Sequence, residues 1–170
     1  GHVGLGRRFP RGVIYGITPF NFPLNLVAHK IGPCIATGNT MLLKPSPRTP
    51  LSAVLLGQVL LAAGMTPGQV NIIACGNELA ATPIADGRVK MVSFTGSPAV
   101  GWPIKQQAMK QKVALELGGN AAAIVCEDAD LAAAVPMIAT AAFAYAGQSC
   151  ISVQRVYVHG SVFERFRDLL

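Results

Sequence analysis

The 170-residue sequence predicts an α/β fold built on a doubly wound parallel sheet. Short apolar runs alternate with longer helical segments, which is the pattern of successive βαβ units. In addition, 51% of the residues are hydrophobic and only 13% are charged, as expected for strands that are buried on both faces. The same apolar excess also fits a chain cut from a larger protein, with a former interface left bare.

The expected elements follow from apolar runs that end at proline, glycine or polar turns. Strands are expected at residues 12–18, 40–43, 70–74, 90–94, 113–117, 122–125 and 153–159. Helices are expected at residues 23–36, 51–63, 78–85, 97–109, 131–144 and 162–170. Asp128 or Asp130 is expected to cap the helix that starts at residue 131. A glycine pair at 118–119 interrupts two strand-like runs and divides the chain into domains 1–118 and 119–170.

The positive charge of the chain, formally +6, does not indicate a nucleic-acid-binding protein. The basic residues are scattered, apart from a cluster of Arg7, Arg8 and Arg11. No segment interleaves aromatic with basic side chains, as a single-strand binding surface would. The charge fits either a solvated basic edge or a field that favours phosphate-bearing ligands.

Membrane and metal roles are not expected either. No apolar stretch approaches the roughly 18 residues that a membrane helix needs, and no signal peptide is visible. The four cysteines lie far apart, without a C-x-x-C pair or a histidine at metal-ligand spacing. Reduced thiols and a cytoplasmic location are therefore expected, with no metal site.

The polar residues of interest follow predicted strands, where ligands bind in doubly wound sheets. Lys44 comes after the apolar run 41–43, and is either a ligand for a ribose hydroxyl or phosphate or a surface lysine. Thr95-Gly96-Ser97 is either a phosphate-binding turn before a helix or an ordinary turn, since no complete glycine-rich phosphate motif is present.

Three further residues could carry chemistry. Cys150 lies in a polar, glycine-flanked loop that suits a nucleophile, whereas the other three cysteines lie in apolar runs and are expected to be inert. Glu116, between two leucines, is either paired for structure or a partly buried general base. Asn21 is either an oxyanion donor in an apolar cleft or a helix cap before Pro23.

Five motifs, in this order, closely resemble the aldehyde dehydrogenase superfamily. They are Thr18-Pro19-Phe20-Asn21-Phe22-Pro23, Leu43-Lys44-Pro45-Ser46, Phe94-Thr95-Gly96-Ser97, Leu115-Glu116-Leu117-Gly118-Gly119-Asn120 and Gly147-Gln148-Ser149-Cys150. The resemblance runs from about Arg8 to Leu170. It implies a Rossmann-like NAD(P)-binding domain over 1–118 and the beginning of a second α/β, catalytic domain over 119–170.

The resemblance also implies roles for individual residues. Cys150 would attack the aldehyde carbonyl, the Asn21 amide and the Cys150 N–H would hold the oxyanion, and Glu116 would activate water to hydrolyse the thioester. Lys44 is similar to the family's ribose-binding lysine, and Gly96 and Ser97 to its pyrophosphate turn. The cofactor-binding residues implied are Ile17, Thr18, Pro19, Phe20, Lys44, Ser46, Pro47, Gly76, Phe94, Thr95, Gly96, Ser97, Val100, Leu117 and Gly118.

Two departures from the family pattern affect the cofactor. NAD-preferring members often carry a glutamate three residues after the lysine, where this sequence has Pro47, followed by Arg48. Nothing there repels a 2′-phosphate, so the cofactor is expected to be NAD or NADP. The segment 75–78 also lacks a second glycine that many members have.

Family enzymes are far longer, so the resemblance implies that this chain is a fragment of a parent that forms a homodimer or homotetramer. Residues 148–155 are similar to the lactaldehyde, glyceraldehyde-3-phosphate and semialdehyde dehydrogenase group, which suggests a small aldehyde substrate. Two alternatives stay open. One is a CoA-acylating dehydrogenase, although such members commonly lack the carboxylate found here as Glu116. The other is a non-catalytic nucleotide-binding module.

Overall fold

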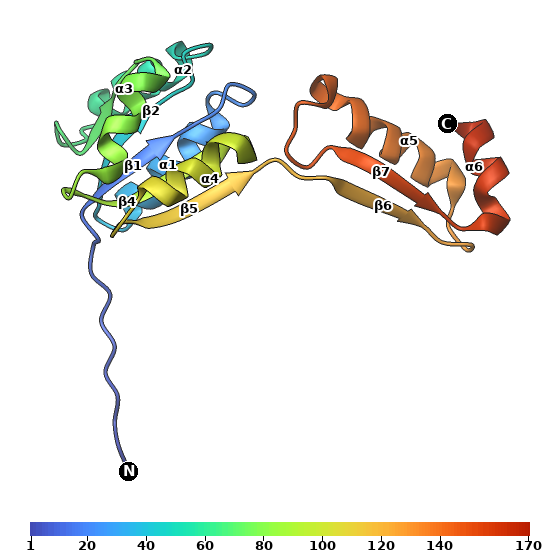
Figure 1. The fold of residues 1–170 in the computed structure, drawn as a ribbon, viewed down its shortest axis with the longest axis horizontal. Helices are drawn as coiled ribbons and strands as arrows, with labels where there is room; N and C mark the ends of the chain where they lie inside the picture. The colour runs from blue at the N-terminus through green and yellow to red at the C-terminus, as the bar shows by residue number, and fades with distance from the viewer. The chain divides into compact units, whose positions relative to one another are not determined.

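The computed structural model describes all of residues 1–170, which form two compact units, Gly1–Glu116 and Leu117–Leu170 (Figure 1). The break falls between Glu116 and Leu117, two residues before the boundary that the sequence suggests between Gly118 and Gly119. The roles of the two domains stay predictions.

The first unit is built on a five-stranded sheet with strand order β3-β2-β1-β4-β5. Its strands are β1 (Val13–Ile17), β2 (Thr40–Lys44), β3 (Val70–Ile72), β4 (Val89–Gly96) and β5 (Lys112–Leu117). β1 pairs in parallel with both β2 and β4, and β2 pairs in parallel with β3. Because the chain winds outward from β1 in both directions, the predicted doubly wound α/β fold is confirmed.

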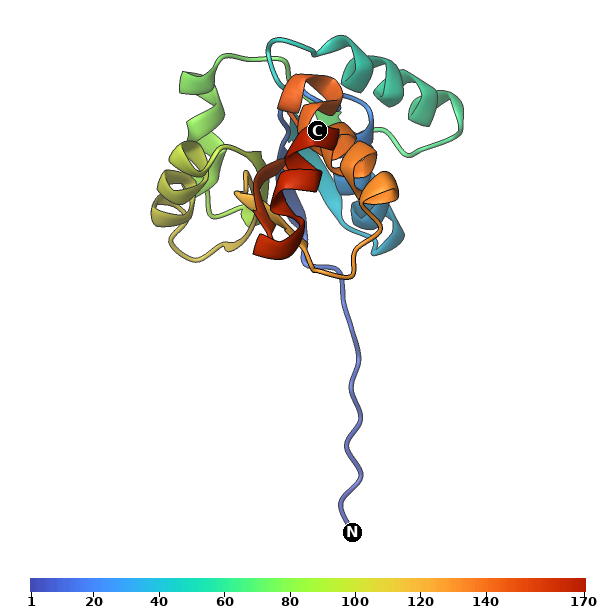
Figure 2. The same ribbon diagram turned by 90° about the vertical axis from the view of Figure 1, so that its right-hand side faces the viewer.

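Helices lie on both sides of this sheet (Figures 1 and 2). They are α1 (Asn25–Ala36), α2 (Leu51–Ala62), α3 (Asn77–Ala81) and α4 (Pro98–Gln107), with a 3₁₀ turn at Thr82–Ala85. Figure 2 shows α1 and α2 on one side of the sheet and α3 and α4 on the other. The sheet is therefore covered on both faces, which explains the low share of charged residues.

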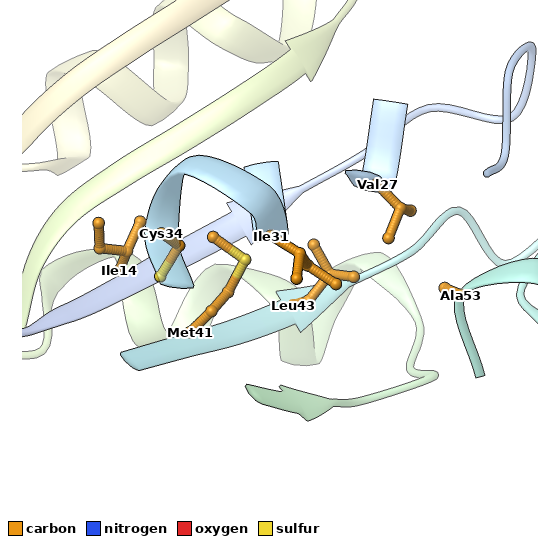
Figure 3. Close-up of a cluster of buried hydrophobic side chains, with 7 residues drawn as sticks. All are labelled: Ile14, Val27, Ile31, Cys34, Met41, Leu43 and Ala53. Atoms are coloured by element: carbon orange, nitrogen blue, oxygen red, sulfur yellow. The ribbon is translucent and has the colours of Figure 1, made fainter. Parts of the chain in front are cut away.

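A buried cluster joins α1 and α2 to the sheet (Figure 3). Val27, Ile31 and Cys34 of α1 follow the i, i+4, i+7 spacing that places side chains on one helix face. They pack against Met41 and Leu43, which alternate on β2 and so point to the same face of the sheet. The helical spacing in α1 and the alternation in β2 thus give the two matching apolar faces that hold α1 against the sheet.

Several boundaries differ from those expected. β4 extends to Gly96, so Thr95 and Gly96 lie in the strand rather than in a turn after it. The helix expected at 78–85 stops being α-helical at Ala81 and continues as a 3₁₀ turn. The reason is Pro83, which has no N–H to donate to the carbonyl of Leu79.

The second unit is smaller and has its own core. Its elements are β6 (Ala121–Val125), α5 (Leu131–Phe143), a 3₁₀ turn at Ala144–Gly147, β7 (Val153–Val158), a 3₁₀ turn at Gly160–Val162 and α6 (Phe163–Leu169). β6 and β7 pair in parallel, and the residues that pack between the strands and helices are Val125, Leu131, Val135, Val162 and Phe166. No helix in either unit is long and apolar enough to cross a membrane.

Helix α5 begins at a side-chain cap. The Asp130 carboxylate accepts hydrogen bonds from the backbone N–H groups of Ala132 (3.0 Å) and Ala133 (3.3 Å). Of the two caps that the sequence allows, Asp130 is therefore the correct one and Asp128 is not.

Candidate functional site

A cavity of about 720 Å³ lies in the first unit at the carboxyl ends of β1, β2 and β4. Most residues that the sequence suggests for cofactor binding line it. They are Ile17, Thr18, Pro19, Phe20, Lys44, Ser46, Pro47, Phe94, Thr95, Gly96, Ser97 and Val100. The segments come together because the carboxyl ends of parallel strands meet at one edge of a sheet.

Three of the suggested residues do not line this cavity. Gly76 precedes Asn77, which does line it, and Leu117 and Gly118 belong to the second unit. The cavity also takes in residues that sequence reasoning did not select, from α3 and from the later turns of α4. These were missed because a helix side chain reaches a cavity through tertiary packing, which leaves no local motif.

Lys44 is the last residue of β2 and is 4% exposed, so the surface-lysine alternative is wrong. Its ammonium donates a hydrogen bond to the Asn77 side-chain oxygen at 3.1 Å. Burial lowers the pKa of Lys44 below its ordinary value, and the neighbouring Cys75 thiol partly offsets that shift. A buried cation with few partners is energetically unfavourable unless a ligand supplies further acceptors.

The loop after Lys44 brings two more functional groups to the cavity. The buried Ser46 hydroxyl accepts a hydrogen bond from the Arg48 N–H at 3.3 Å, which shapes the turn before α2. The Arg48 guanidinium lies 5.2 Å from the centre of the Phe20 ring, within range of a cation–π contact. Thr18, 3% exposed, carries a hydroxyl oxygen that has no hydrogen-bond partner in the protein. Two cationic side chains, Lys44 and Arg48, therefore line the cavity together with the unpartnered Thr18 hydroxyl, and no carboxylate lines it.

Gly96, the last residue of β4 before α4, lies too close to a neighbouring side chain to carry a Cβ atom without rearrangement. A Cβ atom on Gly96 would lie 2.6 Å from the Phe94 ring, which is itself buried. Ser97 is the N-cap residue of α4, with Pro98 in the first turn, so helix α4 starts at the edge of the cavity. The positive end of the α4 dipole is therefore near any ligand in the cavity.

Asn21 lies in the segment between β1 and α1 and is half-buried. Helix α1 begins at Asn25, and Leu24, not Asn21, occupies its N-cap position without a side-chain cap bond. The capping alternative for Asn21 is therefore wrong, whereas its role as an oxyanion donor stays a prediction.

Glu116, near the end of β5, is exposed in the described structure, which corrects the expectation of a partly buried carboxylate. Glu116 lies on the edge strand of the sheet and is the last residue of the first unit. Sequence reasoning missed a charged neighbour, Lys30, which is buried in α1 and donates a hydrogen bond to the Ser93 hydroxyl at 2.9 Å. Burial lowers the pKa of Lys30 to about 8, and the Glu116 charge opposes that shift.

The Cys150 loop follows α5 in the second unit. Tyr145 and Ala146 have left-handed backbone conformations (φ 54° and 55°), as does Gly147 (φ 71°). The buried Ser152 closes the loop, because its hydroxyl donates to the Ala142 carbonyl at 2.9 Å. The Cys150 thiol is exposed, and the Cys150 backbone N–H donates no hydrogen bond within the protein.

All four cysteines are free thiols. Cys34 is buried and Cys75 is partly buried, but Cys126 is exposed like Cys150, so the apolar run around Cys126 does not bury it. Its place explains this, since Cys126 directly follows the last residue of β6.

Comparison with known proteins adds an independent observation. Residues 1–170 match the aldehyde dehydrogenase family throughout. The chain is 47% identical over 165 residues to aspartate-semialdehyde dehydrogenase 1 of Pseudomonas canavaninivorans, covering 97% of this chain and 35% of that protein.

Two solved structures match with comparable quality. Glyceraldehyde-3-phosphate dehydrogenase GapN from Methanocaldococcus jannaschii, in complex with NADP, has a TM-score of 0.90 and 43% identity, over 96% of this chain and 37% of that one. A mutant of aldehyde dehydrogenase C from Pseudomonas syringae, in complex with NAD+ and octanal, has a TM-score of 0.91 and 39% identity, over 95% and 34%. The chain thus spans about a third of the length of these relatives. On the match of all its residues, the chain belongs to the aldehyde dehydrogenase family.

Proposed function

We propose that the chain holds NAD or NADP in the cavity of the first unit and is part of an enzyme that oxidises a small aldehyde to a carboxylic acid. The observation that carries the proposal is the buried ammonium of Lys44, which has one acceptor in the protein although it has three N–H donors. The unpartnered Thr18 hydroxyl lies in the same cavity. A dinucleotide offers hydroxyl and phosphate oxygens that would satisfy both groups.

The residues of the cavity suit the parts of that cofactor. Lys44 and Ser46 would bind a ribose, and the segment of Gly96 and Ser97 that leads into α4 would face the pyrophosphate. The apolar residues Ile17 and Val100 would line the walls. When bound, the nicotinamide accepts the hydride that the substrate carbon loses.

Cys150 would be the nucleophile. Its thiolate sulfur would form a bond to the aldehyde carbon, and the oxyanion would be held by the Asn21 amide and the Cys150 N–H. The absence of a protein acceptor for that N–H supports this role, because an oxyanion donor must be free. Loss of hydride would leave a thioester on Cys150. Glu116 would take a proton from water, whose oxygen attacks the thioester, releasing the acid and the thiolate.

The preference of the chain for NAD or NADP gives the sharpest test of the proposed cofactor site. Pro47 and Arg48 line the cavity and bring no negative charge to it, so we expect the chain to bind NADP at least as well as NAD. A Pro47→Glu variant should weaken NADP binding by about 10- to 100-fold, roughly 1.4 to 2.8 kcal/mol, and should affect NAD little. Calorimetric titration measures both constants.

Pro47→Gln is the matched control, because it alters the backbone in the same way without adding charge. An equal loss in Pro47→Gln would mean that the backbone, not the charge, is responsible. Strong rejection of NADP by the unaltered chain would show that another residue discriminates between the cofactors.

The aldehyde itself is proposed only as a class. Residues 148–155 and the semialdehyde relative both favour a small substrate. A panel of short semialdehydes, lactaldehyde and long alkanals should give the highest kcat/KM among the short members in the complete enzyme. We expect that enzyme to be a cytoplasmic homodimer or homotetramer, which light scattering would test for the oligomer.

A further inference from the structure

Two hydrogen bonds join the sheet to helix α3, which is only five residues long. The buried Tyr15 hydroxyl, on β1, donates to the Ala80 carbonyl at 2.8 Å. The Lys44 ammonium, on β2, donates to the Asn77 side-chain oxygen at 3.1 Å. Asn77 is the first residue of the helix, and its side-chain oxygen accepts the hydrogen bond from Lys44.

Lys44 and Asn77 line the same cavity. A lysine ammonium sits on a flexible four-carbon chain, and without a fixed acceptor it would take many positions. The Asn77 oxygen holds one N–H and leaves two for a ligand in the cavity. Because the ammonium is buried, this single acceptor decides where the charge lies.

The chemistry of the acceptor also matters. A carboxylate at position 77 would neutralise Lys44 and would repel an anionic ligand, whereas the asparagine amide satisfies the ammonium and leaves its charge unopposed. Arg48 adds a second cation to the cavity, and the other polar neighbours of Lys44 are the Cys75 thiol and, beside it, the Tyr15 hydroxyl.

We propose that Asn77 is a positioning residue that holds the Lys44 ammonium toward the cofactor and, being uncharged, allows a 2′-phosphate to bind. The inference rests on the proposed cofactor site. Asn77 acts through Lys44 and does not contact the reacting atoms.

The test is a titration of the 170-residue chain with NADP and NAD at several pH values between 7.5 and 10, for the unaltered chain, Asn77→Leu and Asn77→Asp. In the unaltered chain the NADP dissociation constant should rise with pH as Lys44 loses its proton, at a pH below that of an ordinary lysine because burial lowers the Lys44 pKa. Asn77→Leu should weaken binding of both cofactors about tenfold, since the ammonium is no longer held toward the cavity and must be ordered on binding. It should also move the rise to lower pH, because the ammonium loses an acceptor.

Asn77→Asp should do the opposite to the pH profile, because a carboxylate stabilises the ammonium and moves the rise to higher pH. It should also weaken NADP at least about tenfold more than NAD, through repulsion of the 2′-phosphate. Asn71→Asp, on the exposed part of β3 and outside this cavity, is the matched control for the added charge. A merely structural role for Asn77 would not move the two profiles in opposite directions.

The Lys44→Met variant distinguishes failure of the inference about Asn77 from failure of the proposed cofactor site. If Lys44→Met weakens binding while both Asn77 variants match the unaltered chain, the inference about Asn77 is overturned and the cofactor site stands. If the unaltered chain binds neither cofactor, or Lys44→Met binds as well as it does, the proposed cofactor site is wrong and this inference fails with it. If Asn77→Leu does not fold, Asn77→Asp, which keeps an acceptor oxygen, decides the outcome.

Discussion

Lys30 offers a quantitative test of the packing between α1 and the sheet. Its side chain is 8% exposed, and its ammonium donates to the Ser93 hydroxyl at 2.9 Å. Burial is the main cause that lowers the pKa of Lys30 from 10.5 to about 8, against the smaller opposing effect of Glu116. The folded chain therefore favours the neutral amine, and the unfolded chain favours the ammonium.

The sign and size of the effect follow from this difference. Below pH 8 the group is protonated in both states, and the lowered pKa of Lys30 means that burying its charge costs about 3 kcal/mol of stability. Between pH 8 and 10.5 the unfolded state binds the extra proton, so stability rises with pH until the penalty is gone. Lys30→Met removes the charge and also a hydrogen bond worth about 1 kcal/mol. It should therefore stabilise the first unit by about 2 kcal/mol at pH 7 and by nothing near pH 10.

Urea denaturation, followed by hydrogen exchange of the β1 amides, measures the stability of the first unit separately from the second. Lys90→Met is the matched control, because Lys90 lies on β4 with an exposed side chain and should show a small effect that does not change with pH. A Lys30→Met chain that is less stable at pH 7, or a difference that is constant from pH 7 to 10, would refute the reasoning.

Three further predictions concern the chemistry and its loop. Cys150 should react with iodoacetamide faster than Cys126 near neutral pH if it is the nucleophile, because the two thiols are both exposed and would then differ in their activation. Mass mapping that finds Cys126 labelled first would oppose the nucleophile assignment. In the complete enzyme, Glu116→Gln should slow thioester hydrolysis by about 100- to 10,000-fold and leave hydride transfer nearly intact; rapid-quench kinetics should show a burst, and equal losses in both phases would assign Glu116 another role. Ala146→Gly should stabilise the second unit by about 0.5 to 1 kcal/mol by relieving the left-handed backbone at φ 55°, whereas a lower unfolding midpoint would contradict that strain.

Much of the fold follows from patterns within short stretches of the chain. The i, i+4, i+7 spacing of Val27, Ile31 and Cys34 predicts helix α1, and the short apolar runs predict the strands. The order of these elements is sufficient for a doubly wound sheet, because βαβ connections are right-handed. That order also predicts which loops meet at the carboxyl edge, and so most residues of the cavity.

Contacts between distant segments could not be predicted in this way. Lys44 and Asn77 are 33 residues apart, and Lys30 and Ser93 are 63 apart. Nothing in the local sequence around Lys44 distinguishes a buried lysine from an exposed one, and for Lys30 the surrounding apolar run was the one available signal.

The sequence by itself thus determined the class of fold and the order of its elements, and it suggested the candidate reactive groups, since periodicity and residue chemistry are local properties. The tertiary structure alone decided the burial of Lys44 and Lys30, the exposure of Glu116 on an edge strand and the hydrogen bond between Lys44 and Asn77. These depend on which surfaces pack together. Burial and pairing set the energy of a charge, and both arise only when distant segments meet.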